Sequence, residues 1–367
     1  MRVLIVDDSV VIRKILADTL AEDHEIQVVG AASDGHIGLA KIAQLNPDIV
    51  TLDVEMPVMN GLQTLAEIRK LYPKLPVIMF STLTERGASA TLDALALGAS
   101  DYATKPSNTG SLDVAIESVR HELIPKIKAL CASRVRKPLP APPVRPVPRP
   151  RILTHPRIEI VAIGTSTGGP NALAEVFPGI PKDFPVPIVT VQHMPPVFTR
   201  LLAERLASKS KISVEEGTAG ASLSPGHAWI APGNFHMIVK RVGVNRRVDL
   251  NQDAPENSCR PAVDVLFRSV AAAYGPNVLG VVMTGMGADG VIGSQAIRDA
   301  GGEVIIQDEA SSVVWGMPGL VHAAGQEDGV YPLQEIAPEI TRRVLESRAV
   351  KINAGIPASA VMEPPRR

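Results

Sequence analysis

Five polar residues in the first part of the chain lie at the ends of short apolar runs. They are Asp7 and Asp8 after VLIV (3–6), Asp53 at the end of DIVTLD (48–53), Ser81 at the end of PVIMFS (76–81) and Lys105 in SDYATKP (100–106). Clustered carboxylates repel one another, and Mg²⁺, which prefers oxygen ligands, relieves that repulsion. A lysine neutralises further negative charge on a phosphoryl group. These residue types predict a site that binds a divalent cation beside an incoming phosphoryl group.

A serine, a histidine and an aspartate in the second part of the chain follow three further apolar runs. They are Ser166 in GTSTGGP after EIVAIG (159–164), His193 at the end of PVPIVTVQH (185–193) and Asp289 in NVLGVVMTGMGADG (277–290). Serine is a weak nucleophile until an imidazole takes its proton, and a carboxylate orients that imidazole. The glycine-rich turn satisfies G-x-S-x-G, whereas it lacks the spacings of dinucleotide and P-loop sites. The trio therefore favours hydrolysis through a serine nucleophile.

A second combination of the same residue types is possible in principle. The chain order serine, aspartate, histidine of α/β-hydrolases would select Ser166, Asp289 and His322. His322 lies in VHAAGQ, which is helix-like or a loop and does not follow a strand. We rank this combination second, because functional residues of parallel sheets gather at the carboxyl ends of strands.

Two other histidines and a cysteine compete for a chemical role. His227 and His236 lie nine residues apart, without the i,i+4 spacing that pairs two metal ligands on a helix. Cys259 has no obvious base beside it in the sequence, and an unpaired thiol is commonly a small buried apolar group. We expect these three residues to be structural.

The elements that must position both sets alternate between strand and helix. Short apolar runs separated by amphipathic stretches, such as 11–22 and 61–72, predict a parallel sheet covered by helices on both faces. The same alternation returns over residues 158–350. We therefore predict an α/β protein with an N-terminal flavodoxin-like, five-stranded parallel sheet. The C-terminal unit is predicted to be doubly wound, with a mostly parallel, Rossmann-like sheet.

Prolines divide the chain into two folded units. They recur from Pro138 to Pro156 with arginines between them, so the segment is predicted to be an extended linker. It holds no aromatic residue that could stack on bases, which favours a solvated tether over a nucleic-acid contact. The predicted divisions are 1–125, a linker over 126–157, a second domain over 158–350 and a disordered tail over 351–367.

Composition limits the classes of function. The 367 residues include 37 basic and 38 acidic side chains, for a net charge of -1, so a global basic field for nucleic acid is absent. Two cysteines exclude a disulfide framework and favour a reducing, cytoplasmic location. The first residues are not those of a signal peptide, and no apolar run approaches the ~18 residues of a membrane span. Membrane insertion is therefore not expected.

The N-terminal motifs identify a family resemblance. VDDS, LDVEMPVMNG, FST and TKP resemble the receiver domain of bacterial response regulators, over residues 1 to about 120. The resemblance implies that Asp53 accepts a phosphoryl group from a histidine kinase. It implies Mg²⁺ ligands and a set of residues that respond to phosphorylation. The implied metal residues are Asp7, Asp8, Asp53 and the backbone carbonyl of Glu55, and the implied switch residues are Ser81, Tyr102 and Lys105.

The C-terminal motifs identify a second resemblance. IGTSTGGP, QHMPPVFT, PGHAWIAPGNFHM, RPAVDVLFRS, TGMGADG and QDEASSVVWGMPG resemble the catalytic domain of the chemotaxis protein-glutamate methylesterases, the CheB family, over roughly residues 158–348. The resemblance implies that Ser166 is the nucleophile, His193 the general base and Asp289 the residue that orients it. It also implies an oxyanion hole that includes the Met286 backbone N–H, and no cofactor for the ester hydrolysis.

Together the two resemblances imply a phosphorylation-activated hydrolase of chemotaxis adaptation. Its substrates would be glutamate γ-methyl esters of chemoreceptors, and many relatives also deamidate receptor glutamine. The unphosphorylated receiver would pack over the active-site mouth. The alternative is a two-component regulator whose C-terminal domain acts only by binding a partner. A DNA-binding regulator is disfavoured, because the second unit has no evident helix-turn-helix motif or basic face.

Overall fold

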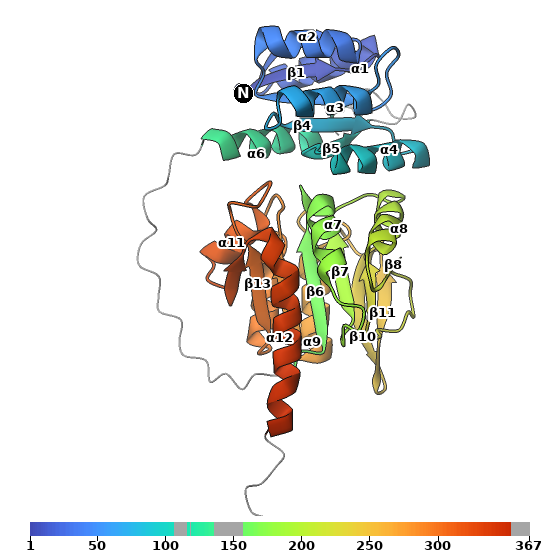
Figure 1. Cartoon of the computed structure of the whole chain (residues 1–367), viewed down its shortest axis with the longest axis vertical. Coiled ribbons are helices and arrows are strands. Elements are labelled where there is room, and N and C mark those ends of the chain that lie inside the picture. The colour runs from blue at the N-terminus through green and yellow to red at the C-terminus, as the bar shows by residue number, and fades with distance from the viewer. Residues whose placement is uncertain (106–115, 118, 136–156, 354–367) are drawn as a thin grey trace, which may run out of the picture.

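A computed structural model of the chain describes residues 1–105, 116–117, 119–135 and 157–353, arranged as two α/β units (Figure 1). The N-terminal unit lies over one end of the C-terminal unit, at the ends of the strands of its sheet. Residues 136–156 of the linker predicted over 126–157 and residues 354–367 of the predicted tail lie outside the described residues.

The described part of the N-terminal unit contains a five-stranded sheet in the order β2-β1-β3-β4-β5, in which all neighbours are parallel. This confirms the predicted five-stranded parallel sheet. The strands are β1 (Arg2–Val6), β2 (Gln27–Ala32), β3 (Ile49–Asp53), β4 (Val77–Ser81) and β5 (Asp101–Thr104). The helices are α1 (Val10–Ala21), α2 (Gly35–Leu45), α3 (Gly61–Leu71), α4 (Glu85–Ala96), the short π-helical segment η1 (Val119–Leu123) and α6 (Ile124–Val135).

Helices α1 to α4 each begin after a residue with a short polar side chain. The caps are Ser9, Asp34, Asn60 and Thr84, and each side chain accepts a hydrogen bond from a backbone N–H in the first turn of its helix. Such a cap satisfies a donor that has no partner within the helix. The local sequence therefore fixes where each helix starts, directly after the loops that carry the polar residues of the sheet edge.

The C-terminal unit contains, among its described residues, a seven-stranded sheet in the order β14-β13-β12-β6-β7-β9-β8, with every pair of neighbours parallel. Strands β10 and β11 form a separate antiparallel two-stranded sheet. The predicted doubly wound, mostly parallel sheet is confirmed. The strands are β6 (Ile160–Thr165), β7 (Ile188–Gln192), β8 (Ser213–Glu216), β9 (His227–Ile230), β10 (His236–Val242), β11 (Asn245–Asn251), β12 (Val278–Val282), β13 (Glu303–Gln307) and β14 (Gly329–Tyr331). The helices are α7 (Gly169–Gly179), α8 (Phe198–Lys209), α9 (Val263–Tyr274), α10 (Val291–Asp299), α11 (Met317–Ala323) and α12 (Leu333–Asn353).

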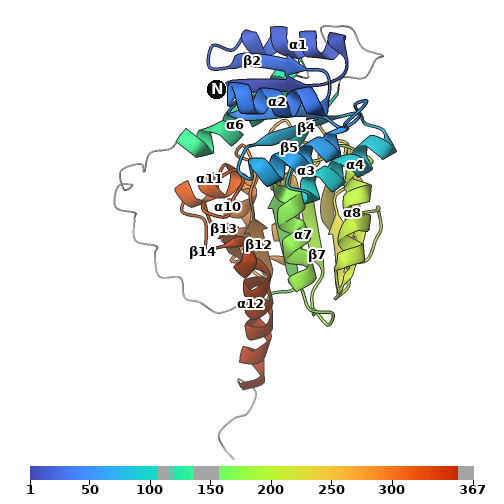
Figure 2. The same cartoon turned by 45° about the horizontal axis from the view of Figure 1, so that its top comes forward.

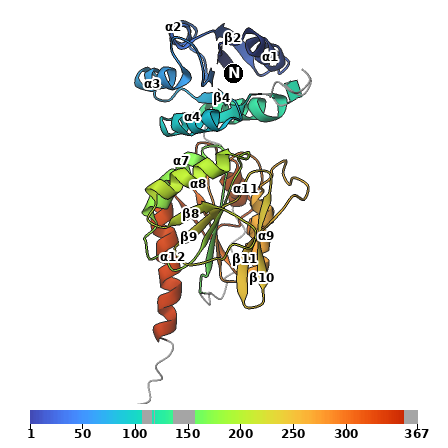
Figure 3. The ribbon, with the colours of Figure 1, turned by 90° about the vertical axis from the view of Figure 1, so that its right-hand side faces the viewer.

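Apolar side chains fill both faces of the second sheet. Figure 3 shows α7, α8 and α12 on one side of this sheet and α9 on the other. Buried residues of α7, α8 and α12 belong to one apolar cluster, and those of α9, α10 and α11 belong to another. Burial of these surfaces is the main stabilising term of such a sheet. None of the helices in the described ranges is both long and apolar enough to cross a bilayer.

Helix α6 enters the segment for which an extended linker is predicted. It continues to Val135, and its apolar residues Ile127, Leu130 and Cys131 are buried against the first unit. The prediction of an extended conformation is therefore wrong for residues 131–135. The physical reason is that the prolines recur only from Pro138, so the backbone donors before it remain available for a helix.

The two units share a continuous apolar interface. Figure 2 shows α4 and α6 of the first unit over the end of the second unit, close to α7, α8 and α11. One apolar cluster includes Leu92 and Leu95 of α4 together with Leu173 of α7 and Phe198 of α8. A separate cluster joins α1, η1 and α6 to Val314 of the second unit. The first unit thus covers the edge of the sheet at which Ser166, His193 and Asp289 were predicted to lie.

Candidate functional site

The predicted trio follows three adjacent strands. Ser166 comes directly after β6, His193 directly after β7, and Asp289 lies between β12 and α10. Because β6 lies between β12 and β7 in a parallel sheet, the carboxyl ends of the three strands meet at one edge. The arrangement of the strands therefore brings together residues that are far apart along the chain.

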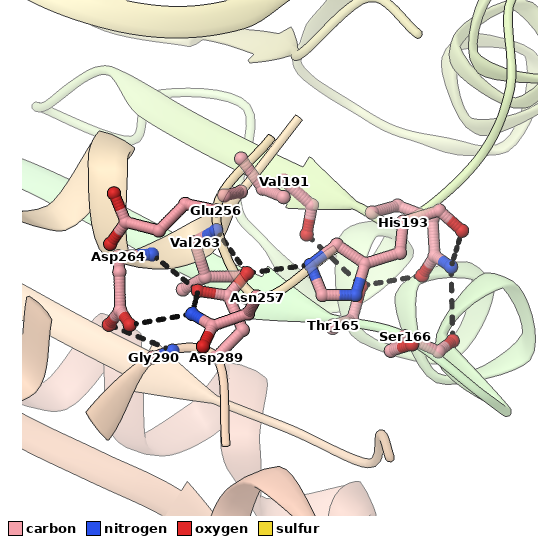
Figure 4. Close-up of polar contacts among 12 residues, drawn as sticks. Thr165, Ser166, Val191, His193, Glu256, Asn257, Val263, Asp264, Asp289 and Gly290 are labelled. Atoms are coloured by element: carbon pink, nitrogen blue, oxygen red, sulfur yellow. Dashed lines mark hydrogen bonds and ion pairs between the residues drawn. The ribbon is translucent and has the colours of Figure 1, made fainter. Parts of the chain in front are cut away.

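His193 and Asp289 form a direct pair. His193 Nε2 donates to Asp289 Oδ2 at 2.8 Å, and the side chains are 11% and 2% exposed (Figure 4). Asp289 also accepts the backbone N–H groups of Val263, at 2.6 Å, and Asp264, at 2.8 Å. These donors lower the pKa of Asp289 against the opposing effect of burial, which is the largest single influence. Asp289 is therefore an ionised, fixed acceptor for the imidazole.

Ser166 lies in the turn between β6 and α7. Its backbone N–H donates to the Thr284 carbonyl at 3.1 Å. Among the described residues, its hydroxyl makes no hydrogen bond with His193. Because Nε2 contacts Asp289, Nδ1 is the ring nitrogen that does not contact this carboxylate. Contacts of this kind are often loose in a free enzyme and tighten when substrate binds.

Gln192 connects the turns that carry Ser166 and His193. Its Nε2 donates to the backbone carbonyls of Ser166, at 3.0 Å, and His193, at 3.3 Å. Its Oε1 accepts the Thr165 hydroxyl at 2.6 Å. The side chain is buried, so these hydrogen bonds hold the ends of β6 and β7 at a fixed separation.

The loop that contains Met286 lies directly against the serine turn. A Cβ at Gly285 would come within 2.8 Å of Ser166 Cβ and 2.3 Å of Met317 Sδ, so only glycine allows this approach. The Met286 backbone N–H has no hydrogen-bond partner among the described residues. It is therefore available as an oxyanion donor. The Met286 side chain packs against the cluster that includes α6, so this loop also contacts the first unit.

Cys259 lies beside the imidazole, contrary to the expectation that no base is near it. Burial disfavours a charged His193, but the hydrogen bond to Asp289 and the interaction with Cys259 outweigh it and raise the pKa of His193 to about 10. The thiol is partly exposed and is not an ordinary buried apolar group. Sequence spacing could not indicate this contact, because Cys259 and His193 are distant along the chain.

The competing histidines have other partners. His322 lies in α11 and pairs with Glu327 at 3.0 Å, whereas Asp289 is taken by His193, so the second-ranked combination is wrong. His227 stacks on Trp229 with ring centroids 4.2 Å apart. His236 contacts the Ala254 carbonyl at 3.1 Å and accepts the Ala262 N–H at 3.2 Å.

The first unit gathers its polar residues at the carboxyl end of its sheet. Lys105 Nζ lies 2.9 Å from Asp7 Oδ2 and 2.7 Å from Asp53 Oδ2. Asp7, Asp8 and Asp53 each offer a carboxylate oxygen within 4.8 Å of the others. Asp8 and Asp53 line a cavity of about 280 Å³, together with Glu55. An all-oxygen donor set with this charge suits Mg²⁺.

Asp7 and Asp53 are buried, whereas Asp8 is exposed. Burial raises the pKa of Asp53 to about 6; Lys105 opposes the shift and the charge of Asp7 adds to it. Ser81 also lines the cavity, and its hydroxyl donates to the Gly87 carbonyl of α4 at 3.1 Å. Asp53 therefore faces a space into which a covalently attached group could extend toward Ser81 and Lys105.

Tyr102 and Asp101 carry contacts from β5 into the second unit. The Tyr102 ring stacks on Phe198 of α8, with centroids 4.9 Å apart and an interplanar angle of 11°. Asp101 Oδ2 accepts the Thr167 hydroxyl at 2.8 Å. Both members of this hydrogen bond are buried, and Thr167 directly follows Ser166. The predicted switch residue Tyr102 therefore lies in the interface, one residue from a direct contact with the serine turn.

Four residues near the trio were not predicted as part of the site: Gln192, Asn257, Cys259 and Asp264. One of them has a signal in the sequence, because Asp264 is an acid within the apolar run VDVLF. A charged residue in such a run is buried only when it has partners. The others carry no comparable signal.

Comparisons with known proteins cover the chain nearly end to end. Residues 161–340 match the CheB methylesterase family, and residues 3–117 match the response regulator receiver domain. A Trichodesmium erythraeum protein named protein-glutamate methylesterase/protein-glutamine glutaminase is 56% identical over 348 residues, covering 94% of this chain and 99% of that protein. A Nocardioides protein of the same name is 50% identical over 362 residues, covering 97% and 98%.

A solved structure supports the same assignment. The Thermotoga maritima CheB methylesterase catalytic domain is 42% identical, with a TM-score of 0.50, and it covers 50% of this chain and 98% of that chain. The predicted resemblance is therefore confirmed for both units. With a receiver unit, a methylesterase unit and relatives of the same length and order, the chain belongs to the CheB family of response-regulator methylesterases.

Proposed function

We propose that the chain hydrolyses glutamate γ-methyl esters of chemoreceptors under control of phosphorylation, in chemotaxis adaptation. The names of its relatives support the substrate, and the His193–Asp289 pair beside Ser166 is the observation that carries the chemistry. In this proposal residues 1–125 form the regulatory domain and 158–350 the catalytic domain. A cytoplasmic location is part of the proposal and is supported by Cys131 and Cys259, neither of which forms a disulfide.

The proposed reaction uses Ser166 as the nucleophile. His193 Nδ1 takes the hydroxyl proton while Oγ bonds to the ester carbonyl carbon. The Met286 N–H donates to the developing oxyanion, and one such donor contributes about 3–4 kcal/mol of transition-state stabilisation. His193 then returns the proton to the departing methoxide, and methanol leaves. Water attacks the acyl-enzyme by the same route and releases the glutamate carboxylate and Ser166.

The same steps account for the second activity named for the relatives. A glutamine side chain offers an amide carbonyl to Ser166, and ammonia would leave in place of methanol. The later hydrolysis of the acyl-enzyme is unchanged. We therefore include glutamine deamidation in the proposal, with the same three residues and no cofactor.

The receiver is proposed to accept a phosphoryl group on Asp53 from a histidine kinase. Asp7, Asp8, Asp53 and the Glu55 backbone carbonyl would hold Mg²⁺, whose charge would offset that of the phosphoryl oxygens. Lys105 already contacts Asp7 and Asp53, so it is placed to contact an added phosphoryl oxygen. Ser81 would then exchange its hydrogen bond with α4 for one to the phosphoryl group.

Control is proposed to act through the interface between the units. Asp101 and Tyr102 of β5 contact Thr167 and Phe198, so the receiver covers the serine turn. Phosphorylation of Asp53, at the carboxyl end of β3, would shift α4 and β5 and weaken these contacts. The catalytic unit would then admit a receptor helix.

Methanol release from methylated receptor membranes tests the proposal. We expect release by the full chain, stimulation by acetyl phosphate with Mg²⁺, and loss of release in Ser166→Ala while Asp53 remains phosphorylated. Ser213→Ala, at an exposed serine at the amino end of β8, serves as the control. Near-normal release by Ser166→Ala would contradict the nucleophile, and no release by the wild type would favour a domain that only binds partners.

A further inference from the structure

A second buried carboxylate lies behind the His193–Asp289 pair. Asp264 is in the first turn of α9 and is fully buried. Its Oδ1 accepts the backbone N–H groups of Gly290, at 2.9 Å, and Gly293, at 2.6 Å. A carboxyl group whose partners are all donors is in its ionised form, because a protonated acid would need an acceptor. Two negative charges are therefore enclosed at this end of the site.

The two carboxylates cap each other's helices. Asp289, just before α10, accepts the N–H groups of Val263 and Asp264 at the start of α9. Asp264, at the start of α9, accepts N–H groups at the start of α10. The close approach requires Gly293, where a Cβ would lie 2.5 Å from Phe267 Cβ. Each acid is thus held by the positive end of the other's helix.

Asn257 joins the two acids. Its Nδ2 donates to Asp264 Oδ2 at 3.0 Å and to Asp289 Oδ1 at 3.1 Å (Figure 4). An amide nitrogen has two hydrogens, so one group satisfies both carboxylates at once. Asn257 has a φ of 53°, which asparagine tolerates better than most residues. The loop therefore places a neutral double donor where like charges would otherwise repel.

We propose that Asp264 is a positioning residue for the esterase reaction, which together with Asn257 fixes Asp289 against His193 and adds a second negative charge behind the imidazole. This inference rests on the proposed function. Asp264 does not contact the reacting atoms; it acts through Asp289. Its charge favours the imidazolium that forms when Ser166 attacks, and the shared amide keeps the two acids from being driven apart.

The other charged side chains around the two acids are paired with each other. Arg268 of α9 pairs with Glu256 through two contacts of 2.6 and 2.7 Å. Cys259 faces His193 from the loop that carries Asn257. Burial raises the pKa of Asp264 and the charge of Asp289 adds to the shift, whereas the Gly293 N–H opposes it. The Asp264–Asp289 pair therefore carries the charge that the imidazole experiences from this side.

Two substitutions test the inference in opposite directions in the full chain. Asp264→Asn keeps an acceptor for the helix start but removes the charge. We expect kcat to fall about tenfold. We also expect the acid limb of the kcat/KM profile to move to lower pH by about one unit, which is the effect of removing one nearby charge at an effective dielectric constant of about 20. Asn257→Gly removes the amide without backbone strain. The two carboxylates then lose a hydrogen-bond donor that offsets their negative potential at His193. The acid limb of the kcat/KM profile should therefore move to higher pH.

The measurement is methanol release from methylated receptor membranes between pH 6 and 10.5, with acetyl phosphate and Mg²⁺. Asp299→Asn, an exposed carboxylate at the other end of α10, is the control and should match the wild type. KM should change little in all three variants. If Asp264→Asn fails to fold, the upward shift in Asn257→Gly still tests the charge argument.

The outcomes separate the inference from the proposed function. A wild type that releases no methanol contradicts the function itself. A functional wild type with lower kcat in both variants but unmoved pH profiles overturns the positioning role and leaves Asp264 a structural cap. Opposite shifts of the two limbs support the inference.

Discussion

Single residues set the pH range in which the proposed esterase works. The contacts with Asp289 and Cys259 raise the pKa of His193 to about 10, above the ordinary value near 6.5. A general base must be deprotonated before it takes the Ser166 proton. At neutral pH most of the imidazole is therefore charged, and only the small neutral fraction starts the reaction.

The first prediction follows from the raised pKa of His193. kcat/KM should rise with pH from 7 toward 10, and Cys259→Ala should move the rise to lower pH, because it removes a group that favours the imidazolium. Cys131→Ala, at the only other cysteine of the chain, should leave the profile unchanged. The profile is measured as initial rates of methanol release. A wild-type profile that is already level at pH 7 would contradict the prediction.

The second prediction concerns the stability of the receiver. Asp53 has a pKa raised to about 6 in the folded state, so it binds a proton more tightly there than in the unfolded chain. Stability therefore falls as pH rises from about 4 to 6, and the ionised group is destabilising at pH 7. Asp53→Asn should increase the free energy of unfolding by about 1–3 kcal/mol at pH 7 without Mg²⁺.

Urea unfolding of the full chain in the presence of a chelator measures this difference. The same variant should lose all stimulation by acetyl phosphate, because an amide does not accept the phosphoryl group. Asp18→Asn on α1 is a matched control that should change neither quantity. A less stable Asp53→Asn chain would show that the charge of Asp53 is favourably paired in the folded state.

At the scale of elements, β5 and α4 connect the receiver to the catalytic unit. β5 carries Asp101 and Tyr102 into the interface, while α4 contacts α7 and α8. At the more exposed part of this interface, α8 contributes Arg200–Glu85 and Arg205–Asp93 ion pairs at 2.7 and 2.8 Å. Exposed ion pairs contribute little, whereas a buried polar contact is costly to break.

The third prediction compares these two kinds of contact. Asp101→Ala removes the buried acceptor of Thr167 and should raise basal methanol release about tenfold without a phosphodonor, for a loss of about 1–3 kcal/mol of interface stability. Arg205→Ala, at the exposed part of the same interface, should change it about twofold or less. Thr167→Val removes the same hydrogen bond from the other side. Equal, small effects of all three would contradict a role for the buried contact.

The elements themselves could be predicted from the sequence to a large extent. Apolar runs predict β1, β3 to β5, β6, β7 and β12 to within a few residues, because buried parallel strands have a distinctive composition. The strand-end rule then placed Ser166, His193 and Asp289 at one edge. The helical residues 131–135 are not indicated in this way, because the prolines that follow them favour an extended chain.

The contacts around the trio could not be predicted in the same way. Cys259 and Asn257 lie in a loop, and Asp264 lies in a helix, whose places depend on how α9 packs against α10. That packing depends on side-chain fit at residues such as Gly293, which strand and helix periodicity does not reveal. The sequence thus indicates which residues share an edge, and tertiary packing decides which of them touch.

At the scale of the whole molecule, the receiver lies over the catalytic edge and contacts both the serine turn and the Met286 loop. The fourth prediction is that deletion of residues 1–150 raises basal methanol release, because it removes these contacts. The related Thermotoga maritima catalytic domain was crystallised as a separate unit, which supports folding of the fragment. Unchanged or lower release by a folded fragment would contradict occlusion by the receiver.

The hydrogen bond between Asp101 and Thr167 also bears on how freely such modules can be exchanged. A receiver from another protein, fused to this catalytic unit, would still accept a phosphoryl group. It would not inhibit the hydrolase, because it lacks the matching interface contacts. Inhibition of the catalytic unit would return only in chimeras that restore a carboxylate at position 101 and an aromatic ring at position 102. Fusion of the two domains is therefore not enough for regulation. Their interface residues must also be complementary.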